Sequence, residues 1–320
     1  MNADIVQTWF EQSVGTKTVL LLTGTRGLGK RRFLEDLYLK ACALNGQTES
    51  SLFLDFEDGD SQPLRTAEQM WHRICERVPT GRFTLFVNEG ASFDDGKRFW
   101  TQLLASKRCS MVCVTSSNRR IFNDLPKGVD VSECHLCPED ASDDDGWSRS
   151  LWYEILLHDV MRGLRLANTR TLELMAKWLS DHMGEPVSLR NIKDDFGKIG
   201  YSISASTLNT YLKALQSAYF FERLDCWDAV RWKVSPYDYC YFPVMLDMRK
   251  CLWGTAPTRE SERMALARAY FSLRRSSGQD AVINTVRNGP HGADFATMGN
   301  DGMRLWRVAC DGEVEQVFLS

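Results

Sequence analysis

The sequence lacks the features that mark membrane, secreted and disordered proteins. No run of 18 apolar residues occurs, and the first ten residues, MNADIVQTWF, do not have the basic-then-apolar layout of a signal peptide. We therefore expect a cytoplasmic protein that does not contact a membrane. Internal repeats and low-complexity tracts are also missing, and the 43% hydrophobic and 25% charged residues are typical of a globular protein.

An excess of charge of one sign is missing as well. The 39 Lys and Arg residues against 42 Asp and Glu residues leave a formal net charge of −3. No global positive field indicates nucleic-acid binding, although a local basic face is compatible with this average. At 320 residues the chain is longer than one hydrophobic core usually supports, which predicts two or three domains.

The ten cysteines do not follow the pattern of a disulfide framework. They are scattered through apolar segments such as CSMVCV and YCYF, which is typical of reduced thiols in a core. One close pair, Cys134 and Cys137 in CHLC, has the spacing of two zinc ligands, but no second pair lies at a fitting distance. We assign no metal ligand and leave metal binding by CHLC open.

Apolar strands alternate with amphipathic helices over residues 1–140. The strands are expected at 18–24, 51–58, 83–89 and 109–117, and the helices at 31–46, 66–77 and 96–106. The strands read as continuous apolar runs, as strands buried on both faces do. This alternation predicts an α/β domain with a mostly parallel sheet and helices on both of its faces.

The first strand leads into a phosphate-loop motif. The pattern G-x-x-x-x-G-K is met by Gly24, Thr25, Arg26, Gly27, Leu28, Gly29 and Lys30. Glycines allow backbone N–H groups to surround phosphate oxygens at a helix N-terminus, and the lysine adds positive charge. Because the motif lies between a buried strand and a helix, residues 1–140 are predicted to be a P-loop NTPase domain that binds ATP or ADP. A glycine-rich turn with an accidental lysine is the alternative.

Two positions depart from a magnesium-dependent site. The hydroxyl residue expected after the lysine is Arg31, followed by Arg32, and the acidic pair expected after the third strand is Asn88-Glu89. A guanidinium cannot coordinate Mg²⁺, and asparagine lacks the carboxylate charge. We expect nucleotide to bind weakly or without metal, with Arg31 in the place of Mg²⁺. Glu89 is the candidate catalytic residue, unless it is only a solvated strand end.

A different pattern follows an acidic segment at 137–150, which has the composition of a linker. Residues 150–250 are predicted to form a helical domain with a winged helix-turn-helix, in which the second paired helix is 204–217 and FERLD and RWKVS are strands. That helix carries one lysine and no arginine, so DNA contacts would need other cations; the candidates are Arg190, Lys193, Lys198 and Arg223. These charges are equally typical of a solvated face.

These motifs resemble a family of bacterial and archaeal AAA-type ATPases that carry a winged helix and a C-terminal restriction-endonuclease-like domain of unknown function. TGTRGLGKRRFL is similar to the family's phosphate loop, LFLDFED to its acidic second strand and LFVNEGASF to its Asp-Glu strand. The segment VTSSN resembles the strand end that senses the γ-phosphate, which implies that role for Ser116, Ser117 or Asn118. The family's Gly-Arg pair is missing, because Val129 follows Gly128.

The resemblance also implies a small α+β nuclease-like domain at 251–320. Glu262 aligns with the family's helix glutamate and Asp294 with its acidic strand, whereas Arg307 lies near a Gln or Lys position. Nuclease sites of this kind need paired carboxylates for magnesium and a lysine, but Gly292 replaces the acidic partner and no lysine follows. We therefore expect no nuclease activity.

Three functions remain open from the sequence. The first is a degenerate AAA-type protein that binds nucleotide weakly, with little or no hydrolysis, and acts as a binding or regulatory module. The second is an active ATPase in which Glu89 and Lys30 suffice and another residue restores the metal site. The third is a DNA-binding regulator that uses the winged helix. The partners predicted are a nucleotide and either DNA or another protein. The oligomeric state stays open, because the usual reason to expect a ring, an arginine after Gly128, is absent.

Overall fold

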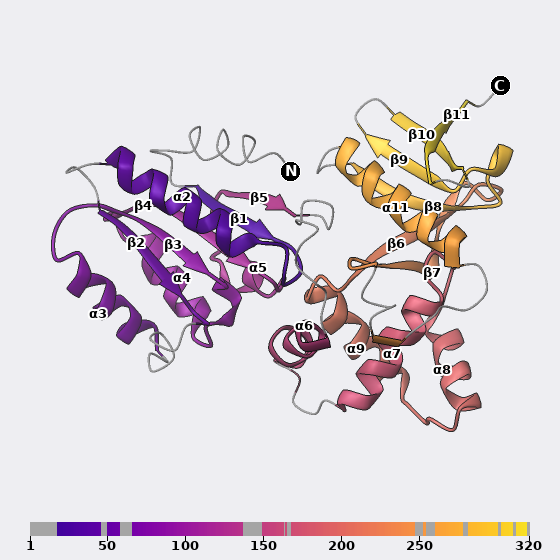
Figure 1. The fold of residues 1–320 in the computed structure, drawn as a ribbon, viewed down its shortest axis with the longest axis horizontal. Coiled ribbons are helices and arrows are strands. Elements are labelled where there is room, and N and C mark those ends of the chain that lie inside the picture. The colour runs from indigo at the N-terminus through magenta and orange to yellow at the C-terminus, as the bar shows by residue number, and fades with distance from the viewer. Residues whose placement is uncertain are drawn as a thin grey trace. The chain divides into compact units, whose positions relative to one another are not determined.

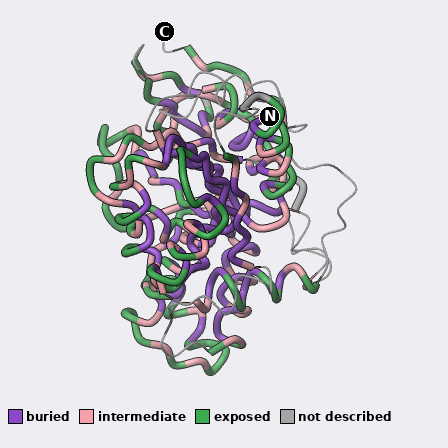
Figure 2. Tube along the Cα trace, turned by 90° about the vertical axis from the view of Figure 1, so that its left-hand side faces the viewer, coloured by how far each residue is buried: buried purple, intermediate pink, exposed green. Residues whose placement is uncertain are grey.

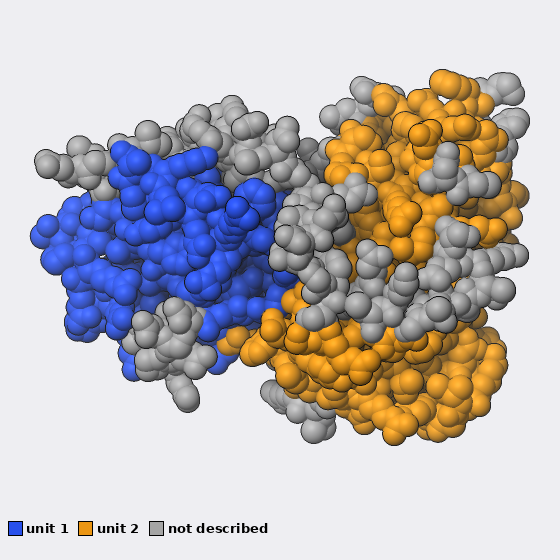
Figure 3. Space-filling model, viewed as in Figure 1, with its two compact units in different colours: residues 1–145 blue, residues 146–320 orange. Residues whose placement is uncertain are grey.

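The computed structural model describes residues 18–45, 50–57, 66–136, 149–162, 164, 168–246, 252–253, 260–277, 281–299, 302–309 and 312–318. The chain divides into two compact units, Met1–Asp145 and Gly146–Ser320 (Figure 3). The expected linker at 137–150 lies almost wholly outside the described residues, and so does Cys137 of the CHLC segment. The finer division into domains at 1–140, 150–250 and 251–320 stays a prediction.

The first unit contains a five-stranded parallel sheet. The strands are β1 (Val19–Thr23), β2 (Ser50–Asp55), β3 (Phe83–Asn88), β4 (Cys109–Ser116) and β5 (Val131–His135), in the order β2-β3-β4-β1-β5 (Figure 1). The helices are α2 (Lys30–Asn45), α3 (Ala67–Arg77), α4 (Gly96–Ala105) and the short α5 (Ile121–Asp124). The predicted α/β fold class is confirmed.

Helices cover both faces of this sheet. One face packs against α3 and α4, where Met70, Ile74, Phe99 and Trp100 join the alternate strand residues in one core cluster. On the other face lies α2, whose Tyr38 makes edge-to-face contacts with Phe53 and Phe86. Every residue of β1, β3 and β4 is buried (Figure 2), which explains their continuous apolar sequences.

Strand β5 has no apolar run and is not predicted from the sequence. This strand pairs in parallel with β1 at the edge of the sheet, and only one of its five residues, Cys134, is fully buried. An edge strand that is half exposed needs no apolar run, so VSECH lacks the pattern that marks the other four strands. Because β5 pairs with one side of β1 and β4 with the other, the residues that follow Thr23 have β4 on one side and β5 on the other.

The second unit begins with helices. They are α6 (Arg149–Glu154), which continues as the π-helical segment η3 (Ile155–Val160), then α7 (Thr169–Asp181), α8 (Leu189–Lys198) and α9 (Ala205–Ser217). Serine residues cap α8 and α9, because the hydroxyls of Ser188 and Ser204 accept hydrogen bonds from the backbone N–H groups of Asn191 and Thr207. Among the described helices of the chain, none has the length and apolarity needed to cross a membrane.

One six-stranded sheet completes this unit. The hairpin β6 (Phe221–Asp228) and β7 (Lys233–Pro243) is joined by β8 (Val282–Arg287), β9 (Phe295–Gly299), β10 (Gly302–Val308) and β11 (Val314–Val317) in the order β11-β10-β9-β8-β6-β7. Helix α11 (Glu260–Ser276) packs against it in a core cluster that contains Tyr270, Phe242 and Phe295. The hairpin predicted for the winged helix therefore shares its sheet and core with the C-terminal strands.

Candidate nucleotide site

The phosphate loop connects β1 to α2 at the carboxyl edge of the parallel sheet. Gly27 and Gly29 have φ of +88° and +73°, in the left-handed region that glycine tolerates, which permits the tight turn of the loop. Leu28 between them is buried and anchors the loop in the domain. At Gly24 (φ +139°) an added Cβ would lie 3.0 Å from the carbonyl oxygen of Leu136, so the loop entrance also requires glycine.

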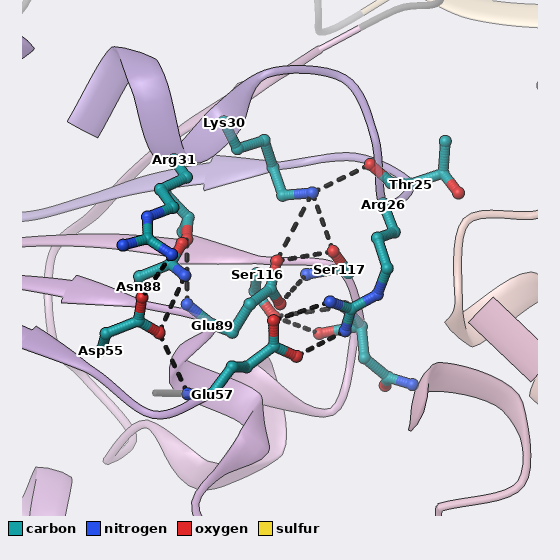
Figure 4. Close-up of polar contacts among 12 residues, drawn as sticks. Thr25, Arg26, Lys30, Arg31, Asp55, Glu57, Asn88, Glu89, Ser116 and Ser117 are labelled. Atoms are coloured by element: carbon teal, nitrogen blue, oxygen red, sulfur yellow. Dashed lines mark hydrogen bonds and ion pairs between the residues drawn. The ribbon is translucent and has the colours of Figure 1, made fainter. Parts of the chain in front are cut away.

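Lys30 points inward, beneath the loop (Figure 4). Its Nζ donates hydrogen bonds to the carbonyl oxygens of Gly24 and Thr25, at 3.0 and 2.9 Å, and to Oγ of Ser117 at 2.8 Å. It also lies 3.6 Å from Oε1 of Glu89. The side chain is only 4% exposed, so the ammonium is held by protein groups from the loop, β3 and β4 together. The strand order β3-β4-β1 makes this convergence possible.

Glu89, the candidate catalytic residue, is buried and held on both carboxylate oxygens. Ser117 donates its backbone N–H to Oε2 at 2.7 Å and its hydroxyl to Oε1 at 2.6 Å. Burial by itself would raise the pKa of Glu89, but the charges of Lys30 and Arg26 and the two hydrogen bonds from Ser117 outweigh it and lower that pKa. Glu89 is therefore a fixed ionised group, and not the solvated strand end that the sequence also allowed.

Arg31 and Asn88, the two departures from a magnesium site, both contact Asp55. The guanidinium NH1 of Arg31 lies 3.1 Å from Oδ2 of Asp55, and Nδ2 of Asn88 donates to Oδ1 of the same carboxylate at 3.0 Å (Figure 4). Thr115 fixes the Asn88 amide by donating its hydroxyl to Oδ1 at 2.8 Å. Asp55 is 6% exposed, whereas 58% of the Arg31 side chain is exposed. The buried carboxylate of Asp55 thus forms an ion pair with Arg31 and accepts a hydrogen bond from the Asn88 amide.

Arg26, the arginine inside the loop, is paired with Glu57. Its NH1 and NH2 groups donate to the two carboxylate oxygens of Glu57, both at 2.6 Å, in a bidentate arrangement. Glu57 follows the end of β2, and its backbone N–H donates to Oδ1 of Asp55 at 3.0 Å. Arg32, in contrast, lies on the exposed side of α2, away from these contacts.

The serine that faces the loop is Ser117. Ser116 is buried, but its hydroxyl donates to the backbone carbonyl of Asn118 at 2.8 Å, while Ser117 joins Lys30 to Glu89. Three residues of this site had no assigned role in the sequence: Asp55, Glu57 and Thr115. The first two lie in LFLDFED, whose resemblance to an acidic second strand was the available signal.

The second unit brings together few of the residues expected to bind DNA. Three of the four candidate cations lie near carboxylates: Arg190 near Asp194 at 3.7 Å, Lys198 near Asp195 at 2.6 Å and Arg223 near Asp225 at 3.9 Å. Arg223 also stacks over the ring of Tyr239, 4.4 Å from its centroid. Lys193 and the single lysine of α9, Lys213, are exposed. This pattern is that of a solvated face, and DNA binding stays a prediction.

The positions expected from the nuclease-like resemblance are not assembled into a site. Oδ2 of Asp294 accepts a hydrogen bond from the backbone N–H of Val308 at 2.8 Å, and burial raises the pKa of this carboxyl. Arg307 donates to Glu315 at 2.6 Å, and Glu262 is exposed on α11. Over the part of the chain that the structure describes, no cluster of three or more His, Cys, Asp or Glu side chains is arranged to hold a metal.

Comparison with known proteins gives distant likenesses of fold. No family model matches the chain, and neither does any curated protein sequence. Among solved structures, it is similar to one of Drosophila ORC bound to AT-rich DNA and Cdc6, with 10% identity, 78% of this chain and 90% of that chain covered, and a TM-score of 0.33. Cdc6p of Pyrobaculum aerophilum gives 11% identity, coverage of 86% and 93%, and a TM-score of 0.32.

A third such structure is the Aeropyrum pernix ORC1 protein in complex with DNA, at 12% identity, with coverage of 78% and 90% and a TM-score of 0.32. Likenesses this distant carry no argument about function. The fold class rests instead on the parallel sheet, in which β4 lies between β1 and β3, and on the loop after β1. The restriction-endonuclease-like part of the resemblance has no support in these comparisons.

Proposed function

We propose that the chain binds ATP or ADP at the loop Gly24–Lys30 without needing Mg²⁺, hydrolyses it weakly or not at all, and acts as a regulatory module. The observation that carries this proposal is the contact of Arg31 and Asn88 with the same buried carboxylate, Asp55. The guanidinium supplies at this point the positive charge that a magnesium ion supplies in an ordinary phosphate-loop site.

The loop fits the phosphates of a nucleotide. It follows a buried strand, opens a helix of 16 residues and turns through two glycines with positive φ, so backbone N–H groups and the helix N-terminus are available to an anion. Thr25 adds a hydroxyl oxygen that is buried and has no hydrogen-bond partner among the described residues. A phosphate oxygen would satisfy this hydroxyl, and Lys30 would supply positive charge beneath the loop.

The residues do not fit a magnesium ion. Mg²⁺ requires oxygen ligands in near-octahedral geometry, and the position that normally offers a hydroxyl is the guanidinium of Arg31. Asp55 supplies carboxylate oxygens, but one lies 3.1 Å from Arg31 and the other accepts from Asn88 and from the backbone N–H of Glu57. A divalent cation there would have to displace the guanidinium of Arg31 from Asp55.

Glu89 is poorly arranged to activate a water. A general base must reach the proton that it removes, and its pKa should lie near the working pH. Both carboxylate oxygens of Glu89 instead accept hydrogen bonds from Ser117, and its pKa is lowered. Together with the altered metal position, this favours a binding role over turnover.

The proposal is tested by calorimetric titration of ATP and ADP, in EDTA and in excess Mg²⁺. We expect binding to wild type in both buffers, with dissociation constants that agree within a factor of about three, and no measurable phosphate release. Lys30→Ala should abolish binding. Lys40→Ala, which removes an exposed lysine from the same helix, is the matched control and should bind as wild type does.

Circular dichroism must show that Lys30→Ala remains folded, because Lys30 compensates the buried charge of Glu89. Binding that appears only with Mg²⁺, or steady Mg²⁺-dependent hydrolysis by wild type, would contradict the proposal. If no nucleotide binds in either buffer, the loop has only a structural role.

A further inference from the structure

Glu57 forms an ion pair with Arg26 of the phosphate loop, and we propose that Glu57 competes with the phosphates of the bound nucleotide for the Arg26 guanidinium. In this inference, which rests on the proposed function, Arg26 is a phosphate-binding residue and Glu57 is a built-in competitor that sets the affinity. The ligand class is a nucleoside diphosphate or triphosphate.

The geometry of the pair supports the exchange. A guanidinium presents two parallel N–H groups, which match two oxygens of a carboxylate or of a phosphate equally well. Arg26 uses both groups on Glu57, at 2.6 Å each. The side chains of Arg26 and Glu57 are 14% and 28% exposed, so the pair is partly withdrawn from water but open to a ligand. A phosphate can therefore replace the carboxylate without rebuilding the arginine site.

The position of Arg26 places it where phosphates bind. It lies inside the loop, between Thr25 and Gly27, and its charge acts on Glu89 strongly enough to contribute to the lowered pKa of that buried carboxyl. The guanidinium therefore belongs to the same electrostatic site as Lys30. Its counterion, Glu57, comes from another element, the end of β2.

The end of β2 supplies one carboxylate to Arg26 of the loop and one to Arg31 in the first turn of α2. Asp55 contacts Arg31 and Glu57 contacts Arg26, and the backbone N–H of Glu57 is fixed on Asp55 at 3.0 Å. Asp55 is buried and also bound by Asn88, which makes it a fixed part of the site. Glu57 is more exposed and has Arg26 as its partner, so it is the carboxylate that can move aside. Affinity for nucleotide then depends on how strongly the Glu57 side chain holds Arg26.

The test is a double-mutant cycle in EDTA, with ADP and ATP titrated into wild type, Glu57→Gln, Arg26→Gln and the double variant. Glu57→Gln should lower the dissociation constant about tenfold, because the phosphate no longer displaces a charged hydrogen-bond partner. Arg26→Gln should weaken binding, and adding Glu57→Gln to it should give no gain. Glu68→Gln, which removes an exposed carboxylate of α3 that pairs with Arg98 of α4, controls for the change in net charge.

The outcomes separate the two proposals. If wild type binds nucleotide and Glu57→Gln binds no more tightly, or gains equally in the Arg26→Gln background, the competition is refuted while the proposed function stands. If neither wild type nor Glu57→Gln binds ADP or ATP, both are refuted. Thermal unfolding of each variant confirms that the comparison is made on folded protein.

Discussion

Replacing Asn88 by aspartate tests whether the Arg31–Asp55–Asn88 group is arranged as described. The two side chains are nearly the same size, so Asn88→Asp changes charge with little change in shape. In the wild type Nδ2 of Asn88 donates to Oδ1 of Asp55 at 3.0 Å. The variant places a second carboxylate there, in a position that is 4% exposed, and the hydrogen bond becomes a repulsion.

The size of the effect follows from the distance. Two unit charges 3.0 Å apart repel by about 5 kcal/mol at an effective dielectric constant of roughly 20. Proton uptake limits the loss, because protonating one carboxyl at pH 7 costs about 1.4 kcal/mol for each of the roughly three pH units above its ordinary pKa. With part of the repulsion offset by Arg31, we expect Asn88→Asp to lose about 2–4 kcal/mol of stability at pH 7.

The assay is urea unfolding of wild type and Asn88→Asp at pH 5 and pH 7.5. Repulsion raises the pKa of the introduced carboxyl in the folded state, so that state binds more protons than the unfolded one. Stability lost by the variant should therefore be recovered as the pH falls and be lost fully only above the raised pKa. Asn123→Asp, at an exposed position on α5, is the control and should be nearly neutral. A loss below about 0.5 kcal/mol, or one that is equal at both pH values, would refute the described contact.

Two further predictions concern the same site. Arg31→Ser combined with Asn88→Asp replaces the guanidinium by a hydroxyl and places a second carboxylate beside Asp55. In the presence of ADP, we expect millimolar Mg²⁺ to raise the melting temperature of this variant but not that of wild type. An unchanged melting temperature would count against Arg31 as the substitute for the metal. Burial opposes but does not reverse the lowering of the pKa of Glu89 by Lys30, Arg26 and Ser117, so the stability that its ionisation contributes is present at neutral pH and lost as the pH falls through the lowered value. Glu89→Gln should therefore destabilise most at neutral pH and progressively less in acid, whereas Glu76→Gln, at an exposed position on α3, should show no such trend in urea unfolding at stepwise lower pH.

The sheet of the first unit was largely predictable from the sequence. Strands such as Val19–Thr23 and Cys109–Ser116 are buried along their whole length, so they must be apolar throughout, and glycine or polar residues mark their ends. The strand Val131–His135 escaped prediction because an edge strand with one buried residue carries no such signal. A continuous apolar run marks a strand that is buried along its length, and a strand with neither such a run nor an alternating pattern is not recognised.

The partners within the site could not be predicted in the same way. Asp55 and Asn88 are 33 residues apart, and their contact depends on the pairing of β2 with β3. Ser117 and Lys30 are 87 residues apart, and they meet because β4 lies between β1 and β3. The choice between Ser116 and Ser117 depends on how the chain turns after the last residue of β4. None of these facts is contained in a local pattern.

The two departures from a magnesium site look independent in the sequence, but they are linked through Asp55. If Arg31 were an ordinary hydroxyl residue, Asp55 would be a buried carboxylate without a cation, which is costly. If Asn88 were the usual aspartate, a second buried carboxylate would lie beside Asp55, and both would depend on the charge of Arg31. With Arg31 and Asn88 together, the buried charge of Asp55 meets the guanidinium of Arg31, which also pairs with the exposed Glu35, and the Asn88 amide completes the hydrogen bonding. The buried charge of Asp55 is therefore compensated without a metal ion, and either change alone would leave a buried carboxylate poorly compensated.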